Sequence, residues 1–423
     1  MRITHLSLKA FRGIVTMELP LGPEPLQLFI GANGAGKTSL LASAAVLLSR
    51  FVGALRRDTS AGRMFADADI HNQHPQTLCS IEVRFAEQPL RWTLSKARAG
   101  RKREAPSDLL ALRDATAIQK DLLLANPLHN LPVIVYYPVQ RAALDIPLRI
   151  RHRASHDPLA TYEGALDGGE RNFRRFFEWY RNQEDLENEG RIASPEHRDP
   201  QLRAVRSAIY RLMPEFSNLR VRRAPLRMEV HKQLGPQESI PLSVAQLSDG
   251  EKDLMATVGD LAMRLAMANP GRADPLTGQG LVLWDEFGLH MHPRWQSLAA
   301  RLPEVFPGCQ FLMTSHSPTL LSHAKEARAH LLEQTGSGVR CVAVERPYGM
   351  DVNRILEEIM GAPVRPVEIR QRIDQLFLLL DKKQLHQALA MKAELEALID
   401  PDDPALVEAT VYAEQLGRSG QAR

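Results

Sequence analysis

A glycine-rich stretch near the front of the chain contains the residue types that bind phosphate. It reads Gly31-Ala-Asn-Gly-Ala-Gly-Lys37-Thr38, with an apolar stretch before it and an apolar helical pattern after it. Glycines let successive backbone N–H groups curl around an anion, the following helix points its positive end at it, and the lysine ammonium bridges the terminal phosphates. The threonine hydroxyl is left for Mg²⁺. The predicted nucleotide-phosphate residues are Asn33, Gly34, Ala35, Gly36, Lys37, Thr38 and Ser39.

Two adjacent carboxylates follow an apolar stretch far along the chain. Leu281-Val-Leu-Trp284 predicts a buried strand, and Asp285 and Glu286 come directly after it. A phosphate loop needs an acidic partner for its metal, so we expect Asp285 to hold Mg²⁺ and Glu286 to polarise the attacking water as a general base. The alternative is a strand that simply ends at the surface, and the position of the pair downstream of a phosphate loop disfavours it.

Two further polar stretches gain a function only from their order in the chain. Ser248-Asp-Gly250-Glu251 opens a predicted helix, which by itself is an ordinary capping pattern. Ser315-His316-Ser317 follows a predicted strand, where a lone histidine is more often structural. The chain order is therefore a phosphate loop, a serine–glycine helix start, a carboxylate pair and a histidine.

This order resembles the motif series of ABC ATPases: Walker A, signature, Walker B and switch histidine. The resemblance implies that His316 contacts the γ-phosphate and joins Glu286 in catalysis. It also implies that Ser248, Gly250 and Glu251 contact ATP held by a second subunit, so that two copies form an ATP-sandwiched head-to-tail dimer or a higher oligomer. ATP and Mg²⁺ are the expected cofactors.

Two residues in the first third of the chain extend the resemblance. Gln140 looks like the family's metal-side glutamine, with Asn72-Gln73 as a rival that lies before a strand hairpin, where related ATPases do not place it. Arg12, in Phe11-Arg12-Gly13, resembles the N-terminal arginine motif of the SMC and RecF-like branch and is expected at the ATP. The predicted metal ligands are Thr38, Gln140 and Asp285.

Two other motifs resemble ATPases of bacterial anti-phage systems. Phe287-Gly-Leu-His290-Met-His292-Pro293 looks like the Leu-His-x-His-Pro loop of standalone defence ATPases. Residues 351–361 resemble the PtuA ATPases of Septu and retron-associated defence systems, which act with a separate HNH nuclease. His290 and His292 also suggest a metal site, but a third ligand is missing, which favours a loop at the dimer contact.

The resemblance leaves three output functions open. Related OLD nucleases carry a Toprim metal-nuclease domain after the ATPase, whereas the corresponding part of this chain clusters only Asp402-Asp403, which reads as a helix cap. We therefore expect no nuclease site of its own, and an ATPase that regulates a separate HNH nuclease in anti-phage defence. The alternatives are a RecF-like repair ATPase that binds DNA or RNA, and a nucleotide-stabilised scaffold with little hydrolysis.

The elements that must position these motifs predict an α/β fold: an ABC ATPase head with a mixed sheet and a β-subdomain. Helical spacing after Lys37 predicts a helix packed on the sheet, and the arginine-rich segment 141–227 predicts a helical lobe with surface ion pairs. Strands are predicted at 26–30, 78–85, 90–94, 133–137, 281–284 and 310–313, with 133–137 central, and amphipathic helices after 367. The expected domains are 1–140, the N-terminal lobe with Walker A; 141–235, the helical insert; 236–350, the C-terminal lobe with the other three motifs; and 351–423, a C-terminal helical extension.

Composition limits the remaining possibilities. The net charge is only +3, from 53 basic and 50 acidic residues, so any nucleic-acid contact must be local; the basic run at 96–103 favours a solvated loop tip over such a contact. Three scattered cysteines fit a reducing compartment. The longest apolar run, 40–48, is too short to span a bilayer. We expect a cytoplasmic protein with no membrane partner.

Overall fold

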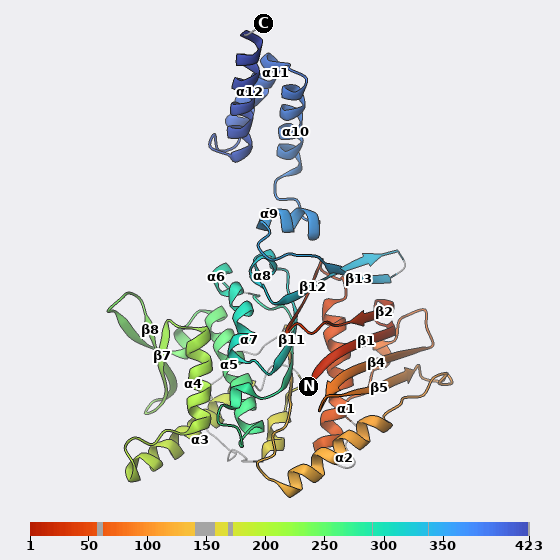
Figure 1. The fold of residues 1–423 in the computed structure, drawn as a ribbon, viewed down its shortest axis with the longest axis vertical. Helices are drawn as coiled ribbons and strands as arrows, with labels where there is room; N and C mark the ends of the chain where they lie inside the picture. Colours follow the sequence, from red (N-terminus) through yellow and green to blue (C-terminus); the bar gives the residue numbers. More distant parts are fainter. Residues whose placement is uncertain (57–61, 140–156, 168–171, 290, 337, 422–423) are drawn as a thin grey trace. The chain divides into compact units, whose positions relative to one another are not determined.

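The computed structural model describes residues 1–56, 62–139, 157–167, 172–289, 291–336 and 338–421 (Figure 1). The chain divides into two compact units, Met1–Val352 and Asn353–Arg423. Apart from Gln140, which lies outside the described residues, every predicted site residue belongs to the first unit.

A six-stranded sheet forms the core of the first unit and consists, in spatial order, of β13 (Gly338–Val344), β12 (Ala327–Thr335), β3 (Leu26–Gly31), β11 (Cys309–Thr314), β10 (Gly280–Trp284) and β6 (Val133–Tyr137). Neighbouring strands are parallel, except that β12 and β13 are antiparallel. Every residue of β3, β6, β10 and β11 is buried, as expected for apolar runs covered on both faces. Because these four strands are parallel neighbours, their carboxyl ends meet at one edge of the sheet.

Strand β6 lies at the end of this order, which shows that the prediction of a central position was wrong. All five of its residues are nevertheless buried, because helices α1 (Lys37–Arg56) and α5 (Asp249–Ala268) pack against it. A continuous apolar run indicates burial on both faces and does not reveal how many strands lie beside it.

Helices α1 and α5 begin at two of the predicted motifs. The buried leucines of α1 recur at the predicted helical spacing, and almost every residue of α5 from Leu254 onward is buried. Among the described helices, α1 has the length and composition to cross a membrane, but 72% of that apolar stretch is buried inside the protein, as in a core helix. Both motifs are thus fixed by helices that are held in the core.

A second sheet, the predicted β-subdomain, is antiparallel and has the order β2 (Ile14–Pro20), β1 (Arg2–Phe11), β4 (Gln76–Phe85) and β5 (Gln88–Ala97). The predicted hairpin corresponds to β4 and β5. Trp92 in β5 donates its indole N–H to the Leu47 carbonyl at 2.9 Å, which ties this sheet to α1. Helix α2 (Leu110–Ala125) packs on α1 and β5. Of the basic run predicted to be a solvated loop tip, residues 101–103 are exposed, whereas Lys96 lies in β5 and Arg98 donates to the carbonyls of Ile70, His71 and His74.

The inserted lobe mixes helices with a third sheet, so the prediction of a largely helical segment was wrong for its last part, from Phe216 onward. The described helices are α3 (Asn172–Ala193) and α4 (Pro200–Leu212), and the sheet contains β7 (Phe216–Arg223), β8 (Leu226–Gln233) and β9 (Ser239–Ser243). Val221 and Val230 face the core, whereas arginines occupy the opposite face. This alternation is the period-2 pattern of a half-buried strand. The many arginines in the segment made its composition look like that of a solvent-exposed helix.

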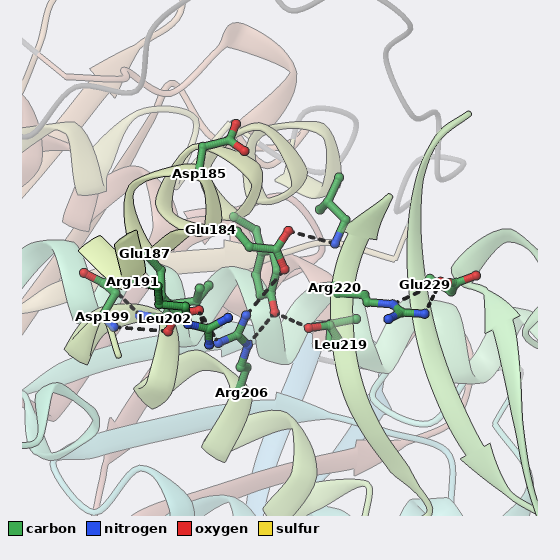
Figure 2. A network of polar contacts seen from close by, with 12 residues as sticks. Glu184, Asp185, Glu187, Arg191, Asp199, Leu202, Arg206, Leu219, Arg220 and Glu229 are labelled. Carbon is green, nitrogen blue, oxygen red and sulfur yellow. Dashed lines mark hydrogen bonds and ion pairs between the residues drawn. The ribbon is translucent and has the colours of Figure 1, made fainter. Parts of the chain in front are cut away.

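A network of charged side chains joins α3, α4 and β7 (Figure 2). Arg206 donates to Glu187 Oε2 at 2.8 Å, to the Tyr180 hydroxyl at 2.8 Å and to Glu184 Oε1 at 3.4 Å. Glu184 also accepts the Val221 amide at 3.0 Å. Ion pairs were predicted on the surface of this lobe, but Glu187 has 0% exposure, because the network lies where the three elements meet.

The described part of the second unit includes a short π-helix, η6 (Ile355–Ile359), and the α-helices α10 (Val367–Asp381), α11 (Leu385–Glu396) and α12 (Pro404–Gln421). Leu376, Leu380 and Leu395 are buried in its own apolar core. Asp403 accepts hydrogen bonds from the two terminal nitrogens of Arg365, at 2.8 and 3.0 Å. It also accepts the Ala405 amide at 2.9 Å at the start of α12, which confirms its predicted capping role. The remaining described α-helices are short: α6 (Pro293–Gln296), α7 (Leu302–Val305) and α8 (Pro318–His323) belong to the first unit, and α9 (Val352–Arg354) begins at its last residue.

Candidate nucleotide-binding site

Three motifs from distant parts of the chain meet at the carboxyl edge of the six-stranded sheet. The phosphate loop follows β3, the carboxylate pair follows β10, and Ser315-His316 follows β11, which lies between the other two strands. Parallel pairing places these strand ends side by side. This edge is also where open α/β sheets generally bind their ligands.

The phosphate loop has a conformation that depends on glycine. Gly31, Gly34 and Gly36 have φ angles of +148°, +81° and +93°, in the region that other residues rarely adopt. A Cβ atom on Gly31 would lie 2.3 Å from the Leu332 carbonyl oxygen. Asn33, Gly34 and Thr38 are exposed around this turn, so its backbone and the threonine hydroxyl face solvent at the start of α1.

Lys37 is buried at the centre of the site. Its ammonium donates to the carbonyl oxygens of Gly31 and Ala32 at 3.0 and 3.1 Å, and lies 2.9 Å from His316 Nε2 and 3.8 Å from Glu286 Oε1. Burial lowers the pKa of Lys37, and the two nearby carboxylates partly oppose this effect. A polyanion bound beside the ammonium would stabilise its charge.

Glu286 and His316 lie close together beside this lysine. Glu286 Oε1 is 3.1 Å from His316 Nε2, and their side chains are 15% and 39% exposed. One imidazole nitrogen can accept a hydrogen bond from Lys37 or donate one to Glu286, but it cannot do both at once. Glu286 also has φ +50°, a strained conformation for glutamate that turns it away from the strand direction.

Asp285 is held by residues that the sequence analysis missed. Its side chain is 1% exposed and accepts the Thr314 hydroxyl at 2.6 Å, and the same hydroxyl oxygen accepts the Glu286 amide at 2.7 Å. The Asp285 amide donates to the Tyr137 carbonyl at 2.8 Å. The position of Thr314 directly before the serine–histidine motif was the available signal, because that strand end lies beside the carboxylates.

The signature-like residues form a capping box at the start of α5. Ser248 donates its amide and hydroxyl to Glu251 Oε2 at 2.9 and 2.8 Å, and Lys232 donates to Glu251 Oε1 at 2.6 Å. Burial raises the pKa of Glu251, but Lys232 and Ser248 outweigh it and lower the pKa below its usual value. Within the described chain, no hydrogen bond or ion pair joins Ser248, Gly250 or Glu251 to the phosphate loop.

Arg12 also lies outside the central cluster. It donates to Asp69 Oδ1 at 2.9 Å and lies over the Phe11 ring, and neither contact reaches the phosphate loop. Gln140 and His290 are outside the described residues, so their predicted roles remain predictions. The described residues contain no group of three or more histidine, cysteine, aspartate or glutamate side chains arranged for a metal.

Comparison with known proteins identifies the family of this site. An AAA domain model matches residues 5–215, and a second, described as an AAA domain, putative AbiEii toxin, Type IV TA system, matches residues 135–322. The chain is an AAA-type ATPase. The fold of this ATPase is the predicted α/β head, since the Walker-type strands lie in the order that brings their loops together.

This ATPase is similar to proteins of defence systems. The Retron Ec83 probable ATPase of Escherichia coli is 25% identical over 98% of this chain and 87% of that protein. The Septu protein PtuA of Bacillus mycoides is 28% identical over 36% of this chain and 21% of that protein. A crystal structure of an SMC head bound to the C-winged helix domain of ScpA is 15% identical, with a TM-score of 0.47 over 81% of this chain and 98% of that chain.

Proposed function

We propose that this ATPase binds and hydrolyses Mg-ATP between the phosphate loop and the Asp285–Glu286 pair. One observation carries the proposal: the Lys37 ammonium lies within 3.8 Å of both His316 and Glu286, although Lys37 is far from both of them in the sequence. The residues present fit a magnesium nucleotide. The loop offers exposed backbone and a buried ammonium, and Asp285 and Thr38 offer oxygen ligands, with Gln140 as a proposed third.

Each residue has a separate role in this proposal. Residues 33–39 bind the phosphates, Arg12 adds a contact to ATP, and bound Mg²⁺ neutralises charge on the terminal phosphates. Glu286 orients and polarises the attacking water, and its strained turn directs the carboxylate toward Lys37. His316 senses the γ-phosphate, because its imidazole would exchange a contact with Lys37 or Glu286 for one with the phosphate.

The direct test compares the wild type with Glu286→Gln. We expect the variant to bind ATP and to lose turnover by at least about a hundredfold, as for removal of a general base. Glu326→Gln, at an exposed glutamate away from the cluster, is the matched control. Equal, negligible rates for the wild type and Glu286→Gln would favour the scaffold alternative.

We also propose that two copies enclose ATP, with Ser248, Gly250 and Glu251 acting on the nucleotide of the other copy. The proposal is supported by the exposed start of α5 and by its lack of described contacts to the phosphate loop of the same chain. Sedimentation of Glu286→Gln with Mg-ATP should show a dimer or larger oligomer, and Ser248→Arg should prevent it. A monomer under the first condition would contradict this part.

The regulated partner is proposed to be a separate HNH nuclease, in cytoplasmic anti-phage defence. Similarity to the retron ATPase over nearly the whole chain supports a defence role. Co-purification of the tagged chain from its native host, followed by mass spectrometry, should recover a nuclease of this kind. Recovery of the chain alone, with and without ATP, would remove the proposal.

A RecF-like nucleic-acid function is the second candidate, favoured by one face of the third sheet. Arg220, Arg222 and Arg227 surround the single carboxylate of Glu229, and these arginine side chains are 41%, 50% and 40% exposed. The surplus positive charge suits a phosphate backbone. ATP-dependent binding of duplex DNA that weakens with salt and in Arg222→Glu would support this candidate, and no binding at low salt would exclude it.

A further inference from the structure

A fully buried ion pair lies on helix α5, outside the cluster around Lys37. Arg264 Nε donates to Asp260 Oδ2 at 2.7 Å, and both side chains have 0% exposure. Removing two charges from water is costly, and apolar residues of similar size are often at least as stable in such a position. The pair does supply hydrogen bonds with fixed directions, and these connect α5 to two other segments.

The first connection runs through Tyr137 to the carboxylate edge of the sheet. The phenol donates to Asp260 Oδ2 at 2.8 Å, and burial together with Asp260 raises the pKa of Tyr137, so that it remains a donor. The backbone carbonyl of the same tyrosine accepts the Asp285 amide at 2.8 Å. One residue therefore joins α5 to the backbone of the proposed metal ligand.

The second connection holds Arg264 from its other side. Its guanidinium donates to the carbonyl oxygens of Thr161, in the 3₁₀ helix η2 (Pro158–Tyr162), and of Glu163, the latter at 3.1 Å. Thr161 donates its hydroxyl back to the Arg264 carbonyl at 2.9 Å, and Arg175 of α3 also donates to the Glu163 carbonyl, at 2.6 Å. These contacts restrain the guanidinium, so that Asp260 is held between Arg264 and the Tyr137 phenol.

We propose that Tyr137, Asp260 and Arg264 form a positioning relay, which sets the placement of Asp285 according to the position of helix α5. The relay rests on the proposed function, in which the Ser248 end of this helix contacts ATP held by a second copy. Since α5 is one continuous helix, a displacement at its start moves Asp260 with it. Engagement of the second copy thereby adjusts the metal ligand of the first.

The experiment compares two buried tyrosines. Tyr137→Phe removes the hydroxyl that reaches Asp260 and keeps the ring, which packs 5.6 Å from the Trp284 ring. Tyr180→Phe removes a similar buried hydroxyl in the lobe, where it donates to the Leu219 carbonyl at 2.6 Å. Both variants should lose stability, but only Tyr137→Phe should lower kcat, by about three- to tenfold, because small displacements at a reacting centre are costly.

Two further readouts separate positioning from a structural role. Tyr137→Phe should keep its KM for ATP within about twofold of the wild type and need more Mg²⁺ for half-maximal turnover. In the presence of ATP it should also bind Mn²⁺ more weakly than Tyr180→Phe does, as measured by electron paramagnetic resonance without turnover. If Tyr137→Phe does not fold, Asp260→Asn carries the same readouts, since it removes the charge that pairs with Arg264 and leaves a weaker acceptor for the phenol. Unchanged kcat and Mg²⁺ dependence in the folded variant, in an enzyme that Glu286→Gln inactivates, would overturn the relay alone; no turnover by the wild type would overturn the proposed function itself.

Discussion

Two clusters of charged side chains in the first unit differ in how completely the protein satisfies them. In the lobe, Glu187 accepts from Arg206 and from the Asp199 amide, and Glu184 accepts from Arg206 and the Val221 amide (Figure 2). At the carboxyl edge of the six-stranded sheet, Lys37, Glu286 and His316 form a second cluster, here called the strand-edge cluster. A single His316 nitrogen lies within reach of both Lys37 and Glu286, although it can form a hydrogen bond with only one of them at a time. Each carboxylate of the lobe network thus has two protein donors, whereas Lys37 and Glu286 share one imidazole nitrogen.

The two clusters serve different purposes. The lobe network joins residues close together in sequence and fixes the packing of α3, α4 and β7. The strand-edge cluster joins both ends of the first unit and includes a strained glutamate, a form of strain that tends to persist at functional sites. Substitutions in the first cluster should therefore change stability, and those in the second should change ligand binding and turnover.

The largest expected effect is loss of nucleotide binding in Lys37→Met. Removing a partly desolvated ammonium that contacts phosphate should weaken ATP binding by at least about a hundredfold, measured by calorimetry with Mg²⁺ present. Lys96→Met, at a half-exposed lysine that pairs with Asp67, is the control. Wild-type affinity in Lys37→Met would show that the cluster is not a nucleotide site.

Arg206→Met should destabilise the protein without changing turnover. The variant removes donors to Glu184, Glu187 and the Tyr180 hydroxyl, and the loss of charged hydrogen bonds predicts a decrease of about 2 kcal/mol in the free energy of unfolding in urea. Turnover at low temperature, where the variant remains folded, should match the wild type. A large loss of turnover per folded molecule would contradict the claim that the lobe network affects stability and not catalysis.

His316→Ala should have a smaller effect on the reaction. The side chain is 39% exposed and supplies one hydrogen bond to a charged group, so we expect kcat to fall by about tenfold, equivalent to about 1.4 kcal/mol. ATP affinity should change less than in Lys37→Met. His323→Ala, at an exposed histidine of α8, controls for loss of an imidazole. An unchanged kcat would remove His316 from the mechanism.

The smallest expected effect concerns the pH dependence of stability at Glu229. Arg222 lowers the pKa of Glu229 to about 2, from 4.5, with help from Arg227 and Arg220 and against burial. A depressed pKa contributes stability above pH 4.5 that is lost as the pH falls toward 2. The wild type should therefore exceed Glu229→Gln by less than about 1 kcal/mol at pH 7, since the arginines are half exposed, and this difference should shrink below pH 4.5. A constant difference across this range would contradict the ion-pair explanation.

The sequence predicted the parts of the site that depend on local patterns. Glycines before Lys37, and apolar runs before Asp285 and Ser315, predicted the strands and the turns after them, and parallel pairing then brought these turns together. The arrangement around them could not be predicted in this way. Thr314 and Tyr137 act on Asp285 only through strand register, which no local pattern specifies.

Long-range packing also accounts for the structural errors. Strand β6 lies at the edge because only β10 pairs with it among the described strands, and this pairing cannot be read from its own residues. Its buried residues are of the same types as those of a central strand. The third sheet was missed because Glu229 and its arginines gave the segment a charged composition, while the alternating buried valines were few.

Binding of Mn²⁺ in place of Mg²⁺, followed by electron paramagnetic resonance in the presence of ATP, tests the central claim most directly. The account predicts one tight site in the wild type that both Thr38→Val and Asp285→Asn weaken by at least about tenfold, because both residues contact one metal nucleotide. Asp374→Asn, in the second unit, should bind like the wild type. Wild-type Mn²⁺ affinity in both Thr38→Val and Asp285→Asn would contradict the account.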